Sequence, residues 1–348
     1  VPMLRLRARL AVASDRLGIS HFLLAASRRL PSAWQRLTIV TWHRVAKNVA
    51  PGFDPGTVSA TPEQFDRQIA MLKASFSIID IAALARYRDE GRALPPCPAL
   101  LTFDDGYRDN LTVAVPILKK HRAHAVFFVS TGFMEERKLF PWEWISAIVT
   151  SSRRSRIDVS YPEPMSLGLG DDVSRRMAVR RLIHRTRTWV GLDWTRFAKE
   201  LAETCESPWD RDKEAKAADE LILDWAGVRA LVEEGMDVQS HGHSHALFPY
   251  ISADDIHQEL STSRQLLERH LGRPPSAVAY PAGAYPIPGT PRYHAVERAG
   301  YRFGFRLDQR TRMLGGITDW LSLPRLCSDP GLGDDQFRSM LAFPNILR

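Results

Sequence analysis

Two adjacent aspartates stand at the end of an apolar stretch. In "LTFDDGYRDN", residues 101–110, Asp104 and Asp105 follow the apolar run at 99–101. Adjacent carboxylates repel, and neither stays ionised in an apolar core without a partner. A cation would relieve the repulsion, because one carboxylate could bind it while the other removed a proton from an activated water. The alternative is a turn or a helix N-terminus, since Asp and Gly suit both.

A histidine cluster offers further metal ligands. The stretch "SHGHSHALF", residues 240–248, contains His241, His243 and His245. His241 and His245 are spaced i,i+4, so on a helical turn they share a face while His243 points elsewhere. Two imidazoles and one carboxylate leave open coordination positions, as in catalytic zinc sites, and iron would fit the same ligands. The alternative is a chance surface cluster, or histidines hydrogen-bonded to the backbone.

The elements that would position these residues alternate between strand and helix. We expect helices after Thr61, after the aspartates, and over 252–270 and 290–299. Such alternation favours a parallel α/β fold, either a barrel or a doubly wound sheet, whose strand ends carry the functional loops. Residues 134–222 are charged and helical in pattern, which predicts a helical insertion. The expected strands are 37–42, 77–81, 98–103, 123–130, 235–240, 276–280, 301–305 and 320–326.

The positive charge is concentrated at the start of the chain. The 348 residues carry a net charge of +7, of which seven arginines and one aspartate place +6 in residues 1–38. We expect a basic N-terminal arm over 1–36, either solvated and packed on the domain or touching an anionic membrane surface. The body is nearly neutral, so we expect no nucleic-acid partner. The arm has neither the apolar run of a spanning helix nor the order of a signal peptide.

The three cysteines suggest a cellular compartment. Cys97, Cys205 and Cys327 are far apart and odd in number, so they indicate no disulfide framework and a reducing environment. Together with the absence of an export signal, this predicts a cytoplasmic protein. A position at the inner surface of the membrane is the alternative.

The motifs, taken in order, are similar to those of a known family. "LTFDDGYRDN", "SHGHSH" and "AYPAG" resemble the polysaccharide deacetylases of carbohydrate esterase family four, which include the nodulation-type chitooligosaccharide deacetylases. The likeness extends to "IVTWHRV" at 39–45 and "LSLPRL" at 321–326. It covers roughly residues 37–345, so we expect one deacetylase domain over 37–348. The resemblance implies a distorted (β/α) barrel of about seven strands, to which the helical insertion is added.

The resemblance also implies roles for individual residues. Asp104 matches the family's general base, and Asp105, His241 and His245 match its metal ligands, usually for zinc. Ser244 stands at the Ser/Thr position before the second histidine, where it would shape the loop by hydrogen bonding.

The third motif departs from the family pattern. The family usually has Arg-x-Pro-Tyr, whereas residues 279–282 read "AYPA", without the arginine that orients the base. The family's Leu-Pro-Arg variant suggests that Arg325 replaces it; the alternative is a surface arginine at a strand end. The backbone N–H near Ala282 could serve as an oxyanion donor. The general-acid motif has no clear match, with His43 and His294 as candidates.

Aromatic residues supply candidate sugar contacts, because their faces suit pyranose rings. Trp144 could join this stacking platform, although core packing is the alternative for any tryptophan. The substrate-binding residues that we expect are Tyr280, Pro281, Ala282, Tyr285 and Trp142.

The sequence therefore predicts a metal-dependent hydrolase that removes N-acetyl groups from an N-acetylglucosamine-type oligo- or polysaccharide and releases acetate. Three alternatives remain at this level. They are a non-catalytic glycan-binding protein on the same fold, a deacylase of another glycan or glycolipid, and a metal hydrolase or oxygenase of another type on the same ligands.

Overall fold

The computed structural model describes residues 12–30, 35–186 and 191–344. Arg5, Arg7 and Arg9 of the basic arm lie outside these ranges. The chain divides into two compact units, which we describe separately. The barrel unit comprises residues 1–47, 58–131 and 225–348, and the second unit comprises 48–57 and 132–224. Among the described residues, no helix is both long and apolar enough to cross a membrane.

Seven parallel strands form a closed barrel in the first unit. Their order around the barrel is β1-β13-β11-β10-β9-β6-β5, and β5 pairs with β1 to close it. This confirms the predicted barrel. The strands are β1 (Arg36–Trp42), β5 (Pro98–Phe103), β6 (Val126–Val129), β9 (Asp237–Ser240), β10 (Ala277–Ala279), β11 (Phe303–Leu307) and β13 (Leu323–Cys327).

Two short strands pair additionally with strands of the barrel. β4 (Ser77–Ile78) runs parallel to β5, and β12 (Arg312–Met313) runs antiparallel to β1. A separate parallel pair joins β2 (Arg44–Val45) to β3 (Val58–Ala60). The strand expected over 77–81 is shorter than predicted because Asp80 caps the next helix, its Oδ1 accepting from the Ala83 N–H at 2.6 Å.

The barrel interior is built from alternate residues of the strands, as a closed sheet requires. Ile39, Leu100, Phe128, Phe305 and Leu323 belong to one buried apolar cluster. In β1, β5 and β13, the next inward-facing residue, two positions after this apolar one, is polar. These polar positions are Thr41, Thr102 and Arg325.

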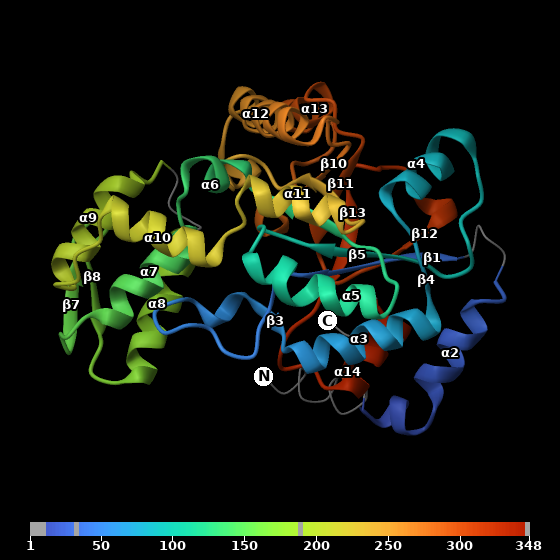
Figure 1. Cartoon of the computed structure of the whole chain (residues 1–348), viewed down its shortest axis with the longest axis horizontal. Helices are drawn as coiled ribbons and strands as arrows, with labels where there is room; N and C mark the ends of the chain where they lie inside the picture. The colour runs from blue at the N-terminus through green and yellow to red at the C-terminus, as the bar shows by residue number, and fades with distance from the viewer. Residues whose placement is uncertain (1–11, 31–34, 187–190, 345–348) are drawn as a thin grey trace. The chain divides into compact units, whose positions relative to one another are not determined.

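Amphipathic helices cover the outside of the barrel. Thr61 and Ser252 form capping boxes at two of them, and Pro62 follows Thr61 as predicted. α12 and α13 lie side by side (Figure 1) and bury Val278 and Tyr280 beneath them. The helices are α2 (Ile19–Ser27), α3 (Pro62–Ser75), α4 (Ile81–Glu90), α5 (Val115–Lys120), α11 (Trp225–Glu233), α12 (Ala253–Leu271), α13 (Pro291–Arg298) and α14 (Asp334–Ala342), with a π-helical turn η3 (Asn110–Ala114) and 3₁₀ turns η4 (Phe248–Tyr250), η5 (Pro281–Gly283) and η6 (Leu314–Gly316).

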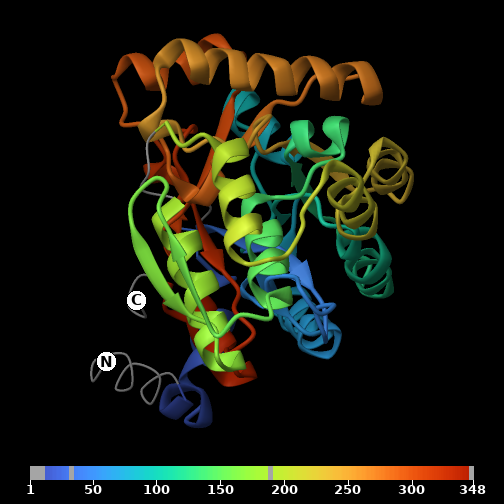
Figure 2. The same cartoon turned by 90° about the vertical axis from the view of Figure 1, so that its left-hand side faces the viewer.

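The second unit is mainly helical but also contains a hairpin. Figure 2 shows β7 (Arg156–Val159) and β8 (Met165–Gly168) as an antiparallel pair in light green, which the helical pattern of 134–222 did not predict. β7 alternates between buried and exposed residues, but with only Ile157 and Val159 facing the core the alternation is too short to stand out in the sequence. Its helices are α6 (Thr131–Glu136, starting at the last barrel-unit residue), α7 (Pro141–Ser151), α8 (Asp172–Thr186), α9 (Trp194–Thr204) and α10 (Arg211–Leu221), with the 3₁₀ turn η2 (Pro55–Thr57).

Candidate metal and catalytic site

Asp105 lies two residues beyond the end of β5, in a tight turn of the chain. Asp105 and Gly106 both have positive φ, 77° and 90°, a conformation that Asp and Gly tolerate better than other residues. A Cβ at position 106 would come within 3.1 Å of Val129, so space as well as conformation favours glycine there. The turn leaves the Asp105 carboxylate buried at the carboxyl end of the barrel, with the residue only 2% exposed.

Asp104 is held by Arg325 in a two-pronged ion pair. Nη1 of Arg325 donates to Oδ1 of Asp104 at 2.7 Å, and Nη2 donates to Oδ2 at 2.6 Å. Nη1 also lies 3.2 Å from Thr41 Oγ1 and 3.4 Å from Thr102 Oγ1. Arg325 is 0% exposed, so it is no surface arginine. The guanidinium therefore fixes the position of the Asp104 carboxylate inside the barrel.

Arg325 sets the charge state of its partner. Burial raises the pKa of Asp104, whereas the charge of Arg325, the charge of His241 and the hydrogen bonds from Arg325 lower it, with a net result below the usual value. Burial also raises the pKa of Asp105, but the imidazoles of His241 and His245 beside it bring that pKa well below its usual range. Both carboxylates are therefore ionised at neutral pH.

The histidines reach the site through an irregular loop, so the expected helical turn is wrong. Residues 241–247 after β9 have no helical hydrogen bonding, and Gly242 and His245 take positive φ of 78° and 59°. The two predicted ligands still converge on one carboxylate. Nε2 of His241 lies 3.4 Å and Nε2 of His245 lies 3.5 Å from Oδ1 of Asp105.

These three donors suit a metal ion. Their ligand atoms all lie within 4.8 Å of one another, and Oδ1 of Asp105 is a buried atom without a hydrogen-bond partner among the described residues. Nδ1 of His241 lies 2.8 Å from the Ala279 carbonyl oxygen. A proton on Nδ1 therefore leaves the Nε2 lone pair facing Asp105, the tautomer that binds metals. Tetrahedral ligands about 2.0–2.1 Å from zinc stand about 3.3 Å apart, close to these separations.

A glutamate that sequence reasoning missed supports the histidine loop. The carboxylate of Glu259, on α12, accepts the backbone N–H of His243 at 2.7 Å and that of Ser244. It also accepts the Ser244 hydroxyl at 3.0 Å, which gives Ser244 the loop-shaping contact expected of it. A Cβ at position 242 would come within 3.1 Å of Oε1 of Glu259. The loop is thus folded around this carboxylate.

The family assignment follows from a match over more than half of the sequence. The model of the family described as polysaccharide deacetylase matches residues 92–304, which include every ligand of the site. The chain belongs to the polysaccharide deacetylase family. It is therefore an enzyme, a hydrolase that de-N-acetylates a glycan. No curated protein matches the sequence.

Solved structures of deacetylases share the fold of this deacetylase. The deacetylase PplD of Streptococcus pyogenes, in complex with acetate, is 18% identical with a TM-score of 0.56, over 86% of this chain and 96% of that chain. A de-N-acetylase from Aggregatibacter actinomycetemcomitans is 16% identical with a TM-score of 0.54, over 88% and 100%. IcaB from Ammonifex degensii is 16% identical with a TM-score of 0.53, over 89% and 97%.

In this deacetylase, the stretch that begins with the third motif, residues 279–285, has a buried part and an exposed part. Tyr280 is 0% exposed, donates its hydroxyl to the Leu321 carbonyl at 2.8 Å and packs in the core. A substrate contact of its side chain would thus require the core to rearrange. Pro281 is buried beside it, whereas Ala282 is exposed with a positive φ of 52°. The partly exposed Tyr285 has the Arg306 guanidinium 5.0 Å from its ring centroid.

The tryptophans expected to bind sugar lie in the second unit of the deacetylase. Trp142 is partly exposed and stacks on Phe140 at a centroid distance of 4.6 Å. Trp144 is buried against Trp194 and Phe197, so it packs the core of this unit. Of the two, only Trp142 offers surface to a ligand, and its role stays a prediction.

The two histidines considered for the general acid differ in position. His43 directly follows β1, and its charge lowers the pKa of both Asp104 and Asp105. Its carbonyl accepts from Nδ2 of Asn110 at 2.7 Å, and its N–H donates to the Ser59 hydroxyl at 2.9 Å. His294 is instead an exposed residue of α13, with Nδ1 2.8 Å from Oε2 of Glu297. Of the pair, His43 has the electrostatic contact with the site.

Glu259→Ala should weaken zinc binding about 10- to 100-fold, the usual effect of losing a residue that orients metal ligands. The change leaves two backbone N–H groups of the histidine loop without their acceptor. Glu259→Gln keeps one acceptor oxygen and should recover most of the affinity. The measurement is a competition titration of the metal-free protein with zinc. Glu268→Ala, at an exposed position of the same helix, is the control; unaltered affinity in Glu259→Ala would refute the role.

Proposed function

We propose that this deacetylase is a zinc-dependent hydrolase that removes N-acetyl groups from an N-acetylglucosamine-type oligo- or polysaccharide and releases acetate. The observation that carries the proposal is the convergence of Asp105, His241 and His245 beside an ionised, arginine-held Asp104. The similar structures are those of deacetylases and of a de-N-acetylase, which supports the same chemistry.

Asp105, His241 and His245 would hold the metal. Zinc bound there supplies Lewis acidity toward the amide carbonyl and makes water more acidic. The Asp105 carboxylate contributes negative charge, and the Ala279 carbonyl fixes the His241 ring through its Nδ1. These residues are buried or nearly so, which strengthens their electrostatic interactions with whatever binds between them.

Asp104 is the general base of this proposal. Its carboxylate stays ionised because Arg325 lowers its pKa, so an Oδ atom is available to accept a proton from the attacking water. The guanidinium occupies both carboxylate oxygens from one side and thereby fixes the direction in which the remaining lone pairs point. Arg325 is accordingly a positioning residue for the base.

The remaining roles concern the leaving group and the carbonyl oxygen. We assign to His43 the donation of a proton to the departing amine nitrogen, because it is the histidine outside the ligand set whose charge acts on both aspartates. The exposed Ala282 would donate its backbone N–H to the developing oxyanion, a role that needs no side chain. Tyr285 would offer an aromatic face to a sugar ring.

Asp104→Asn should lower the rate of acetate release by about 10²- to 10⁴-fold, because asparagine cannot take the proton. Zinc should still bind, since the three ligands are unchanged. The measurement is acetate release from a panel of N-acetylated glycans and glycolipids, with and without chelator, together with elemental analysis. The panel separates N-acetylglucosamine chains from other glycan substrates, and iron in place of zinc would refute the metal assignment.

Asp237→Asn is the matched control. Asp237 is also a buried aspartate held by an arginine, Arg273 at 2.8 Å, but it begins β9 at the opposite end of the barrel. It should keep full acetate release. Equal activity of Asp104→Asn and the unaltered protein would exclude Asp104 as the base.

A further inference from the structure

The barrel unit exposes an apolar face far from the catalytic end. Residues 17–30 present five large apolar side chains to solvent, whereas singly scattered apolar residues are normal on surfaces. We call residues 17–30 the α2 face. Its exposed apolar residues are Leu17 (75% exposed), Ile19 (43%), Phe22 (69%), Leu23 (36%) and Leu30 (45%).

The opposite side of α2 is fastened to the barrel unit. The Ser20 hydroxyl lies 3.1 Å from that of Ser339 on α14, and Leu24 is buried. The Ser27 hydroxyl lies 3.2 Å from Sγ of Cys97, next to the start of β5. These three residues recur at helical spacing, so they hold one side of the helix inward and keep the apolar side chains of the α2 face outward.

The α2 face also carries positive charge without negative charge. Residues 16–38 contain Arg16, Arg28, Arg29 and Arg36 and no acidic residue. The neighbouring acid, Asp15, is paired with Arg338 on α14. A surface on which Arg16, Arg28 and Arg29 flank a short helix with large exposed apolar side chains matches the headgroup region of an anionic bilayer.

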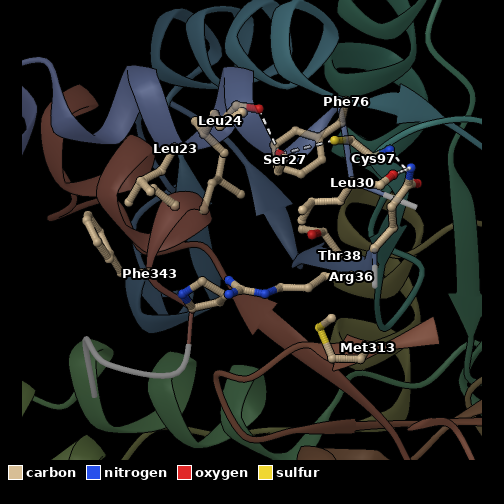
Figure 3. Close-up of a pocket in the computed structure, with 15 residues that line it drawn as sticks. Leu23, Leu24, Ser27, Leu30, Arg36, Thr38, Phe76, Cys97, Met313 and Phe343 are labelled. Atoms are coloured by element: carbon tan, nitrogen blue, oxygen red, sulfur yellow. Dashed lines mark hydrogen bonds between the residues drawn. The ribbon is translucent and has the colours of Figure 1, made fainter. Parts of the chain in front are cut away.

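A cavity opens beside the same helix. It has a volume of about 490 Å³, and Figure 3 shows Leu23, Leu24 and Phe343 along it, with the Arg36 side chain extending into it. Met313 of β12 borders it too. Arg36 is the first residue of β1, so the cavity lies where the barrel strands begin. Apolar walls with one guanidinium are compatible with lipid chains and their anionic headgroups.

We propose that the α2 face docks on the surface of an anionic phospholipid bilayer. Leu17 and Phe22 enter the interface between headgroups and acyl chains, and the arginines contact lipid phosphates. Because Asp104, Asp105 and His241 follow the carboxyl ends of their strands, the catalytic end of the barrel then points away from the membrane. The docking does not depend on the proposed reaction, so either can fail without the other.

The experiment is co-sedimentation of the full chain with phosphatidylglycerol vesicles and with phosphatidylcholine vesicles, at low and at high ionic strength. We expect at least tenfold stronger binding to phosphatidylglycerol, weakened by salt. Arg16→Glu with Arg29→Glu should reduce the binding by about fivefold or more for each arginine. Leu17→Glu with Phe22→Glu should abolish binding, and both positions are exposed enough for the fold to tolerate the change.

Ile287→Glu is the matched control, since Ile287 is 72% exposed on the loop before α13; it should bind as the unaltered chain does. Circular dichroism verifies that each variant is folded. Equal binding to both lipids, or an equal loss in Ile287→Glu, would overturn the proposal. So would light scattering that shows the α2 face joining two copies of the chain while vesicles remain unbound.

Discussion

Arg325→Met should lower the free energy of unfolding by about 3–5 kcal/mol, the usual cost of leaving one charge of a buried ion pair without its partner. The variant leaves the Asp104 carboxylate, which is 1% exposed, inside the barrel without its arginine partner. Thr41 and Thr102 cannot compensate, because their hydroxyls contact the guanidinium at 3.2 and 3.4 Å and bring no charge. Chemical denaturation at neutral pH measures the loss. Acetate release should fall as well, since Asp104, the proposed base, loses the guanidinium that orients it.

The pH dependence of this loss has a defined sign. With Arg325 present, the pKa of Asp104 lies below its ordinary 3.8, so the pair stabilises the protein above that pH and loses its effect as the pH falls further. Arg325→Met removes the charge and the hydrogen bonds of the guanidinium, which lower the pKa of Asp104 against the effect of burial, so that pKa rises. The difference between the two proteins should therefore shrink as the pH falls from 7 toward 4.

A double variant separates the charge from the packing. Asp104→Asn in the Arg325→Met background removes the stranded charge and should recover at least half of the lost stability. If Arg325→Met unfolded at the same denaturant concentration as the unaltered protein, the ion pair would not make the predicted contribution to the free energy of unfolding.

Zinc should raise the stability of the metal-free protein by about 4 kcal/mol when its free concentration is about 1,000 times the Kd. The reason is that the proposed zinc site, formed by Asp105, His241 and His245, is assembled only in the folded chain. Thermal unfolding with and without chelator measures this shift. Asp105→Ala should abolish it, because one of three protein ligands is gone.

His243→Ala is the control for the zinc effect. His243 belongs to the same loop, but its Nδ1 lies 3.1 Å from the Thr131 hydroxyl, and it is not one of the three converging donors. This variant should keep the full zinc shift. A shift that survives in Asp105→Ala, or disappears in His243→Ala, would contradict the assigned ligand set.

Much of the barrel could be predicted from local patterns. The strand expected at 98–103 has the bounds of β5, and Thr61 caps its helix as expected. The hairpin β7–β8 was missed because short strands with two core residues give a weak alternation signal. The strand predicted at 77–81 is longer than the observed β4, because the capping preference of Asp80 outweighs the apolar run around it.

The sequence by itself determined the chemical types at the site. Aspartates and histidines after predicted strands indicated metal-assisted hydrolysis, because parallel strands bring their carboxyl ends together. The same motifs indicated the family that the match over residues 92–304 establishes. Residue type and order along the chain sufficed for these conclusions.

Only the tertiary structure decided how these groups are held. Arg325 and Asp104 are 221 positions apart, and they meet because closure of the barrel places both side chains in its interior. The histidines converge through a loop wrapped around Glu259 instead of a helical turn. Nothing near Glu259 in the sequence marks it, since on α12 it is simply the residue before the buried Leu260. Contacts of this kind depend on the packing of distant segments, which local spacing does not encode.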